Sequence, residues 1–215
     1  MSARIHPTAL IEDGVVIGAD TVVWDNVHIR HSTSIGERCI IGEKTHIAYG
    51  VRIGDLVKIN AMVYICTAVT IEDGVMISAG TIFTNDRFPR AAFPDLREPR
   101  PSEPDERTLP TVVRAGATIG AGCVIGCDLE IGRFAMIGMG SVVTKSVPAF
   151  HLAIGNPARS VGVVCRCGAP VYRHGRGGVV PPQAQLEAAC PSCARRYVIS
   201  GAFVRELVPT HAAAI

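Results

Sequence analysis

Aromatic residues are scarce in this chain, and long apolar runs are missing from it. Phe, Trp and Tyr together make up 5 % of the 215 residues, and there is a single Trp. A core must therefore be built from small and β-branched side chains. No run of about 18 apolar residues occurs, so we expect neither a membrane-spanning helix nor a membrane partner.

Neither positive nor negative charge predominates in the chain, because 21 Lys and Arg nearly balance 19 Asp and Glu. A formal net charge of +2 gives little attraction to nucleic acid, which we do not expect as a partner. The first residues contain no apolar core of a signal peptide and lead directly into a repeat. We therefore expect a cytoplasmic location.

An aliphatic residue returns at every sixth position through most of the chain. An α-helix, with 3.6 residues per turn, would spread this period around its axis, whereas a short strand followed by a tight corner preserves it. Three such units would make a coil of about 18 residues, and successive coils would stack as parallel strands about 4.8 Å apart. The series runs through Ile5, Ile11, Ile17, Val23, Ile29, Ile35, Ile41, Ile47, Ile53, Ile59, Ile65, Ile71, Ile77 and Phe83, and resumes with Val113, Ile119, Ile125, Ile131, Ile137 and Val143.

A second position of the repeat, four residues later, holds small residues such as Thr21, Thr45 and Ala117. Together the two positions resemble the hexapeptide transferase signature, aliphatic-Gly-x-x-small-x, over residues 5–148. This resemblance implies an all-β fold, a left-handed parallel β-helix. We expect it to form an acyltransferase domain over residues 1–162.

The repeat is interrupted by a proline-rich loop, residues 84–112. Its six prolines cannot continue a hydrogen-bonded ladder, and long irregular loops inside compact domains are usually functional or disordered. The repeat resumes in phase, and Phe88 and Phe93 offer apolar anchors. We therefore expect a lid over a cleft or an arm onto a neighbouring subunit.

The motif FTNDRFPRA (Phe83–Ala91), with AIGNPAR (Ala153–Arg159), resembles nucleotide-linked amino-sugar N-acetyltransferases, which act on 3-amino and sometimes 4-amino sugars. The resemblance implies that Asn85 lies beside the sugar amine and that Asp86 takes the following acidic position. It also implies a homotrimer with active sites between subunits. Arg87 and Arg90 of the same motif are candidate substrate-binding residues.

Stacking places residues 18 apart above one another, which gives an independent view of the site. Asn85 then tops a column of Thr67, Tyr49 and His31, and a second column holds Ile82, Tyr64, His46 and His28. We take His31, Tyr49 and Tyr64 as further substrate-binding candidates. His46 is a candidate general base beside Asn85 and Asp86.

The co-substrate would be acetyl-coenzyme A. Its pantetheine arm needs close approach to backbone, for which Gly122 and Gly140 are candidates. Lys145 and Arg159 could meet its phosphates as cations. The expected reaction is acetyl transfer to the amine of a nucleotide-linked amino sugar, in the biosynthesis of bacterial surface glycans or natural-product sugars.

The last segment, residues 163–215, changes composition. Two cysteine pairs, Cys165 with Cys167 and Cys190 with Cys193, have the spacing of two short knuckles around a tetrahedral Zn²⁺. A segment this small cannot build a core alone, so a structural metal would supply its folding energy. We expect a zinc-ribbon-like unit; a redox pair or a vestigial metal site is the alternative.

Three other functions stay open. O-acyl transfer to a sugar or serine hydroxyl would need a firm base such as His46. A carbonic anhydrase would need three His ligands, and the spacing of His28, His31 and His46 does not match well. A non-enzymatic β-helix scaffold is the third, and the FTND motif speaks against it.

Overall fold

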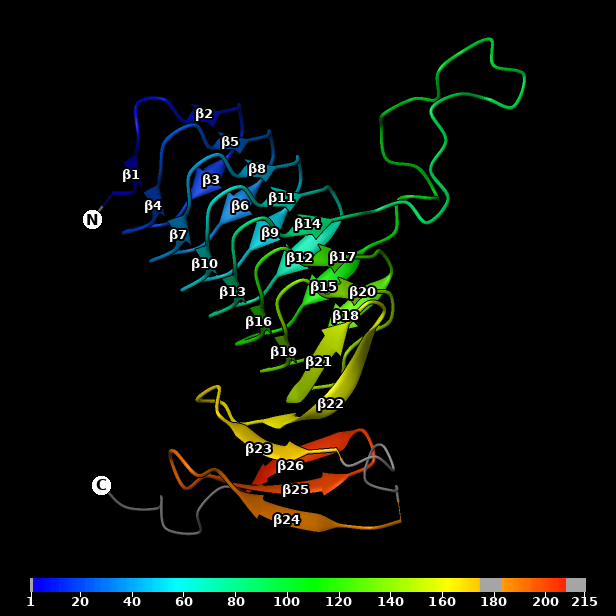
Figure 1. Cartoon of the computed structure of the whole chain (residues 1–215). Coiled ribbons are helices and arrows are strands. Elements are labelled where there is room, and N and C mark those ends of the chain that lie inside the picture. The colour runs from blue at the N-terminus through cyan, green and yellow to red at the C-terminus, as the bar shows by residue number, and fades with distance from the viewer. Residues whose placement is uncertain (1, 175–182, 208–215) are drawn as a thin grey trace.

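The computed structural model describes residues 2–174 and 183–207, and all of its regular elements in these ranges are β-strands (Figure 1). Most strands are two residues long and separated by tight corners. No helix occurs in the described ranges, so no helix there could span a membrane.

Three sheets form the faces of the coil, and up to β20 the strands pair in parallel, with every third strand joining the same sheet. The first sheet contains β1 (Arg4–Ile5), β4 (Val22–Val23), β7 (Ile40–Ile41), β10 (Lys58–Ile59), β13 (Met76–Ile77), β16 (Thr118–Ile119), β19 (Met136–Ile137), β21 (His151–Gly155), β22 (Ala158–Val164) and β23 (Pro170–Arg173). The second contains β2 (Leu10–Ile11), β5 (His28–Ile29), β8 (His46–Ile47), β11 (Tyr64–Ile65), β14 (Ile82–Phe83), β17 (Val124–Ile125) and β20 (Val142–Val143). The third contains β3 (Val16–Ile17), β6 (Ser34–Ile35), β9 (Arg52–Ile53), β12 (Val69–Ile71), β15 (Thr111–Val113) and β18 (Leu129–Ile131).

The register of these sheets follows the six-residue repeat. Ile5 pairs with Val23, one coil later, and Phe83 pairs with Ile125 across the inserted loop. The repeat therefore resumes in phase, and the predicted all-β, parallel β-helix is confirmed. Its left-handed sense is that of the hexapeptide repeat.

The core is a ladder of inward-pointing aliphatic side chains. Ile29, Ile47 and Ile65 are completely buried, as are most members of the series. Ile5, in the first coil of the series, is 42 % exposed. Hydroxyl groups in this core are paired: Thr33 Oγ1 donates to the carbonyl of Ala48, 2.9 Å away on the next coil.

Glycine after the aliphatic residue is required by how closely the coils stack. A Cβ atom on Gly36 would lie 2.6 Å from the backbone of Gly54, the equivalent glycine of the next coil. That separation is impossible for real atoms, so a larger residue there would force the coils apart. The glycines of the signature therefore set the spacing of the coils.

The chain leaves the β-helix through β21, β22 and β23, which pair antiparallel. A small sheet of β24 (Leu186–Ala189), β25 (Arg196–Ser200) and β26 (Phe203–Leu207) follows (Figure 1). It has its own buried cluster, which includes Tyr197 and packs against Phe150 at the end of the β-helix. The predicted boundary at residue 162 falls inside β22 and remains a prediction. Parts of the predicted unit, residues 175–182 and 208–215, lie outside the described residues.

Two imidazoles share one hydroxyl at the junction of the β-helix with β22 and β23. Ser160 Oγ lies 2.7 Å from Nδ1 of His151 and 3.0 Å from Nε2 of His174. His151 is 1 % exposed, so its ring is shielded from water. Burial, aided by His174, lowers the pKa of His151 to about 4.

We predict that the protein loses stability as the pH falls from about 6.5 to about 4. In this window His151 is protonated in the unfolded chain but stays neutral in the folded chain. The free energy of unfolding therefore decreases as the pH is lowered. The full shift corresponds to about 3 kcal/mol. Thermal unfolding measured between pH 7.5 and 4.5 checks this, and His151→Asn should flatten the dependence. His6→Asn, at an exposed ring, is the matched control; equal pH dependence in both variants would contradict the prediction.

Candidate functional site

A cavity of 340 Å³ lies at the corner between the second and third sheets, where the proline-rich loop leaves the β-helix. Its wall on the coil side comes from the ends of β8 and β11 and from the turns that follow them. Its other side comes from the loop. The residues lining it that matter below are Arg30, His46, Tyr49, Tyr64, Asn85, Asp86, Arg90, Arg100, Ser102, Asp105 and Arg107.

The loop is held over this wall at its base. The backbone N–H of Leu109 donates to the carbonyl of Asn85 at 2.8 Å, which pins its two ends together. Tyr49 Oη donates to the carbonyl of Ser102 at 3.3 Å, which ties the returning strand of the loop to the wall. The loop therefore closes one side of the cavity, as a lid would.

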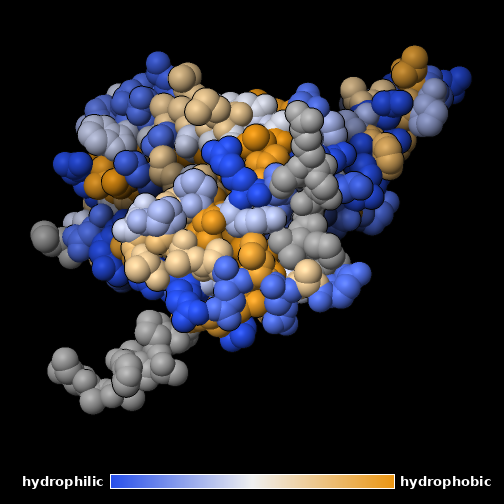
Figure 2. Space-filling view, turned by 60° about the horizontal axis from the view of Figure 1, so that its bottom comes forward, coloured by the Kyte–Doolittle hydropathy of each residue, from blue (hydrophilic) through white to orange (hydrophobic). Residues whose placement is uncertain are grey.

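The outer part of the loop projects away from the body as an arm (Figure 1). Ala92 and Pro99 form an antiparallel bridge near its tip. The predicted apolar anchors Phe88 and Phe93 are 77 % and 40 % exposed, and Leu96 beside them is 82 % exposed, so the described part of the chain does not bury the arm. Figure 2 shows apolar and polar surface side by side on this arm.

The two predicted columns are present in the wall. His46 pairs in register with His28 and Tyr64, and the His46 and Tyr64 rings stack with centroids 5.3 Å apart. His31 stacks on Tyr49 with centroids 5.1 Å apart. Burial, then the charges of His28 and Arg30, lower the pKa of His46, so its imidazole is neutral near pH 7. A neutral imidazole can accept a proton.

Asn85 and Asp86 enter the cavity from the first residues of the loop. The Asn85 side-chain amide has no hydrogen-bond partner among the described residues and is available to a ligand. The Asp86 carboxylate accepts the N–H of Phe88 at 2.7 Å, which fixes the start of the loop. Asn85, Asp86 and His46, predicted as catalytic, therefore line one cavity.

The substrate-binding candidates divide into two groups. Tyr49, Tyr64 and Arg90 line the cavity, whereas His31 lies behind Tyr49. Arg87 points elsewhere and forms an exposed ion pair with Asp128 at 2.8 Å, which fastens the loop to the following coil. Arg87 and His31 thus support the site from outside the cavity.

Three arginines that line the cavity were not predicted from the sequence as site residues: Arg30, Arg100 and Arg107. Arg30 pairs with Glu12 and Arg107 with Asp105. Arg100 has no carboxylate partner within the described ranges, and its Nε is buried without a partner. Arg30 directly precedes His31 of a predicted column, so the 18-residue spacing could have located it. The irregular loop has no such spacing, so nothing in the sequence indicated that Arg100 and Arg107 reach the cavity.

The coenzyme candidates lie apart from one another. Gly122 and Gly140 occupy left-handed turns at the corner between the first and second sheets, with φ of 67° and 68°, and a Cβ atom on either would meet open space. Lys145 follows β20 at the corner that carries the loop, and Arg159 lies on β22. None of the four lines the 340 Å³ cavity. A larger hollow on the first sheet, beside Trp24 and Ile40, contains none of the predicted residues.

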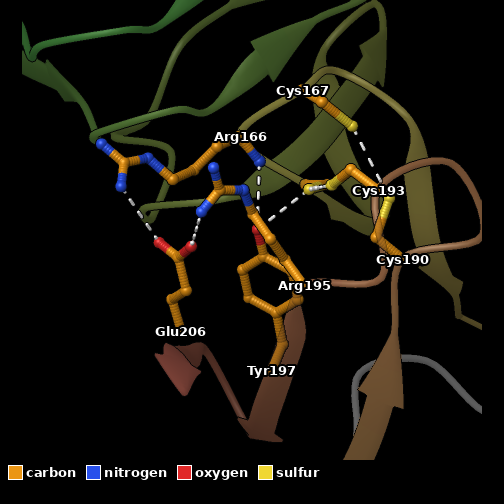
Figure 3. A network of polar contacts seen from close by, with 8 residues as sticks. Arg166, Cys167, Cys190, Cys193, Arg195, Tyr197 and Glu206 are labelled. Carbon is orange, nitrogen blue, oxygen red and sulfur yellow. Dashed lines mark hydrogen bonds and ion pairs between the residues drawn. The ribbon is translucent and has the colours of Figure 1, made fainter. Parts of the chain in front are cut away.

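The four cysteines of the tail converge on one point. Their Sγ atoms lie within 4.8 Å of one another, with Cys165 to Cys193 at 3.4 Å and Cys167 to Cys190 at 3.6 Å (Figure 3). Zn–S bonds of about 2.3 Å in a tetrahedron imply S···S separations of about 3.8 Å, close to these values. In the described part of the chain, no other group of three or more His, Cys, Asp or Glu side chains is arranged for a metal, and His28, His31 and His46 do not form one.

Comparisons with known proteins agree with the fold. Residues 14–49 match the family "Bacterial transferase hexapeptide (six repeats)", and residues 32–67 match "Hexapeptide repeat of succinyl-transferase". A point mutant of AntD, an N-acyltransferase from Bacillus cereus in complex with dTDP and coenzyme A, superposes with a TM-score of 0.52. It is 21 % identical, over 76 % of this chain and 81 % of that chain.

Two kinds of curated relative match shorter stretches. The dTDP-3-amino-3,6-dideoxy-alpha-D-galactopyranose 3-N-acetyltransferase of Aneurinibacillus thermoaerophilus is 39 % identical over 98 residues, which is 46 % of this chain and 45 % of the relative. The serine acetyltransferase of Escherichia coli K12 is 52 % identical over 50 residues, 23 % of this chain and 18 % of the relative. The match thus spans less than half the length of these relatives. The hexapeptide repeats matched over residues 14–67 and the stacked coils agree, and the chain folds as the β-helix that such repeats build.

Proposed function

We propose that the protein is an acetyl-coenzyme A dependent N-acetyltransferase that acts on the amine of a nucleotide-linked amino sugar, with the amine at carbon 3. The observation that carries the proposal is the cavity that joins the unpaired Asn85 amide, the neutral His46 and the unpaired Arg100. The 39 % identity to a 3-N-acetyltransferase of a dTDP-linked sugar supports the same acceptor. Surface-glycan or natural-product sugar biosynthesis would use such a product.

The chemistry needs a neutral amine held against a thioester. The amine nitrogen attacks the thioester carbonyl carbon, a C–N bond forms, the C–S bond breaks, and coenzyme A leaves as the thiol. Asn85 Oδ1 can accept one N–H of the amine and fix the direction of the nitrogen lone pair. His46 is the group suited to accept the proton that the nitrogen loses, and Asp86 is the second candidate.

The diphosphate of the acceptor would meet the cationic side of the cavity. Arg90 and Arg100 come from the outgoing and returning segments of the loop and form no ion pair in the described ranges, although the Arg100 charge also acts on Asp105. Both guanidinium groups can therefore still receive an anion. Planar guanidinium groups suit phosphate oxygens. Tyr49 and Tyr64 offer ring faces and hydroxyls beside them for the sugar or base.

The rest of the assembly follows from the exposed features. Coenzyme A would lie along the coil edge at Gly122 and Gly140, with Lys145 and Arg159 as cations for its phosphates.

The apolar arm tip at Phe88 and Leu96 fits a neighbouring copy of the chain, in a homotrimer with sites between subunits. The cytoplasmic location stays a prediction, and eight free cysteines suit a compartment where thiols stay reduced.

The tail would bind a structural Zn²⁺ through Cys165, Cys167, Cys190 and Cys193. The convergence of four sulfur atoms supports this, since thiolates are ligands that zinc prefers. The ion would hold the turn between β22 and β23 against the loop between β24 and β25. It has no role in acetyl transfer in this proposal.

O-acetyl transfer to a hydroxyl is the second candidate. The 52 % identity to a serine acetyltransferase over 50 residues favours it, as does the presence of His46 in the cavity. A hydroxyl needs a base more than an amine does, because it is a weak nucleophile when neutral. Acceptor panels containing both amines and hydroxyls separate the two.

We predict that Asn85→Ala lowers kcat/KM for the amino-sugar acceptor about 100-fold, because the amine loses its orientation. The assay follows thiol release from acetyl-coenzyme A with nucleotide-linked 3-amino sugars, 4-amino sugars and the matching hydroxyl sugars. Asn26→Gly is the control, since Asn26 has φ of 53° at an exposed turn away from the cavity and glycine accepts that conformation. No thiol release with any amine would refute N-acetyl transfer.

We predict that Arg100→Gln raises KM for the nucleotide-linked acceptor about tenfold or more and leaves kcat nearly unchanged. The variant loses a charge-assisted hydrogen bond to the diphosphate, which contributes to binding in the ground and transition states alike. Titration with dTDP in a calorimeter measures the same loss directly. Arg97→Gln, an exposed arginine of the same loop outside the cavity, should bind dTDP as the wild type does. Equal affinity in both variants would remove Arg100 from the binding site.

We predict that the protein purified with a reducing agent contains about one zinc ion per chain, and that a chelator makes the tail sensitive to protease. Elemental analysis and limited proteolysis measure the two effects. Cys193→Ser should lose the metal, whereas Ser192→Ala next to it should keep it. Zinc-free protein from cells supplied with zinc, with a protease-resistant tail, would show that the cysteines serve another purpose.

A further inference from the structure

The Glu12 carboxylate lies one coil before the cavity and is shared among three groups. It accepts hydrogen bonds from the backbone N–H of His31 at 2.9 Å and from Nε of Arg30 at 3.0 Å, and it lies 2.8 Å from Nε2 of His28. The first of these contacts, with the other two, lowers the pKa of Glu12 to about 2. Glu12 therefore stays ionised at any pH at which the protein works.

Each of the three groups touches a residue of the cavity wall. The His28 ring meets the His46 ring edge-on, with centroids 4.9 Å apart and planes at 82°. The other two flank Tyr49: Arg30 lies 5.5 Å from the ring centroid, and His31 stacks 5.1 Å away at 3°. His46, Tyr49 and Arg30 line the cavity, whereas Glu12, His28 and His31 do not.

We propose that Glu12 is a positioning residue that fixes the His46 imidazole and the Tyr49 ring from behind, so that both face the substrate in one arrangement. The reaction it serves is the proposed acetyl transfer, on which this part of the inference rests. The geometry is independent of that reaction. Without the carboxylate, His28 loses its acceptor, and Arg30 is freed from its place against Tyr49.

Glu12 also sets the electrostatic environment of His46. Burial, His28 and Arg30 oppose protonation of His46, and the negative charge of Glu12 alone among these groups favours it. Tyr64 covers one ring face, and across the cavity stand both signs of charge: Asp86, Arg90, Arg100, Glu103, Asp105 and Arg107. Removing the Glu12 charge leaves Arg30 and His28 uncompensated, so the pKa of His46 falls further.

The test is Glu12→Gln, which keeps the shape and removes the charge. The experiment uses the full chain in the assembly that it forms on purification. NMR of histidine labelled at Cε1 monitors the titration of His46, which we expect to move to lower pH. The acid limb of the kcat/KM profile should move in the same direction, and kcat should fall about tenfold with little change in KM for acetyl-coenzyme A. Glu37→Gln, at an exposed turn of the next coil, is the matched control. It should leave the His46 titration, the pH profile and kcat unchanged.

The two readouts separate this inference from the proposed function. A shifted His46 titration in a protein that transfers no acetyl group would sink the proposed reaction and leave Glu12 as the residue that holds His46. An unchanged His46 titration in Glu12→Gln would overturn the inference, whatever the activity. Lower activity with both pH profiles unchanged would also overturn it, since a general loss of structure would produce that result.

Discussion

Close stacking of successive coils in one fixed register is the constraint on which this structure depends. Each inward aliphatic side chain lies on its equivalent from the neighbouring coil, as Ile29 does on Ile47. Full burial of such a side chain contributes about 1.5–3 kcal/mol, and the stacking repeats it along the whole prism. The close approach at Gly36 leaves no room to slip, since a shifted register would bring a Cβ atom against backbone. The outward side chains consequently form straight columns, although their coils are 18 residues apart in sequence.

The candidate site is a consequence of those columns and of one interruption. His28, His46 and Tyr64 form one column, and the loop enters at its end, where Asn85 follows β14. The backbone bond between Leu109 and Asn85 closes the loop without disturbing the register, because Phe83 still pairs with Ile125. A rigid wall thus carries the rings, and the irregular segment carries the arginines that complete the cavity. Such a division would allow substitutions in the loop to alter what the cavity binds while the wall keeps its geometry.

Periodic parts of the molecule could be predicted from the sequence, and aperiodic parts could not. The columns of His46 and Tyr49 follow from counting residues, and the structure confirms them. The loop offers no period, so the positions of Arg100 and Arg107 depend on contacts that counting does not reveal. Arg87 illustrates the limit: its motif placed it with Arg90, but it pairs with Asp128 on the next coil. The position of Glu12 could also be predicted by counting, since it lies 18 residues, one coil, before Arg30. Its contacts with His28, Arg30 and the backbone of His31 could not be predicted in this way.

The tail is joined to the β-helix through the same residues that frame its cysteines. Arg166 lies between two of the cysteines in sequence, covers the Phe134 ring at 4.5 Å and pairs with Glu206 on β26. Tyr197 Oη donates to Cys165 Sγ at 3.0 Å (Figure 3). The Tyr197 ring also packs edge-on against Phe150. An ion held by the four sulfur atoms would therefore order the groups that cover the last coil. Phe150 belongs to the end of the β-helix and packs against the buried cluster of the tail, so the tail shields that end from water.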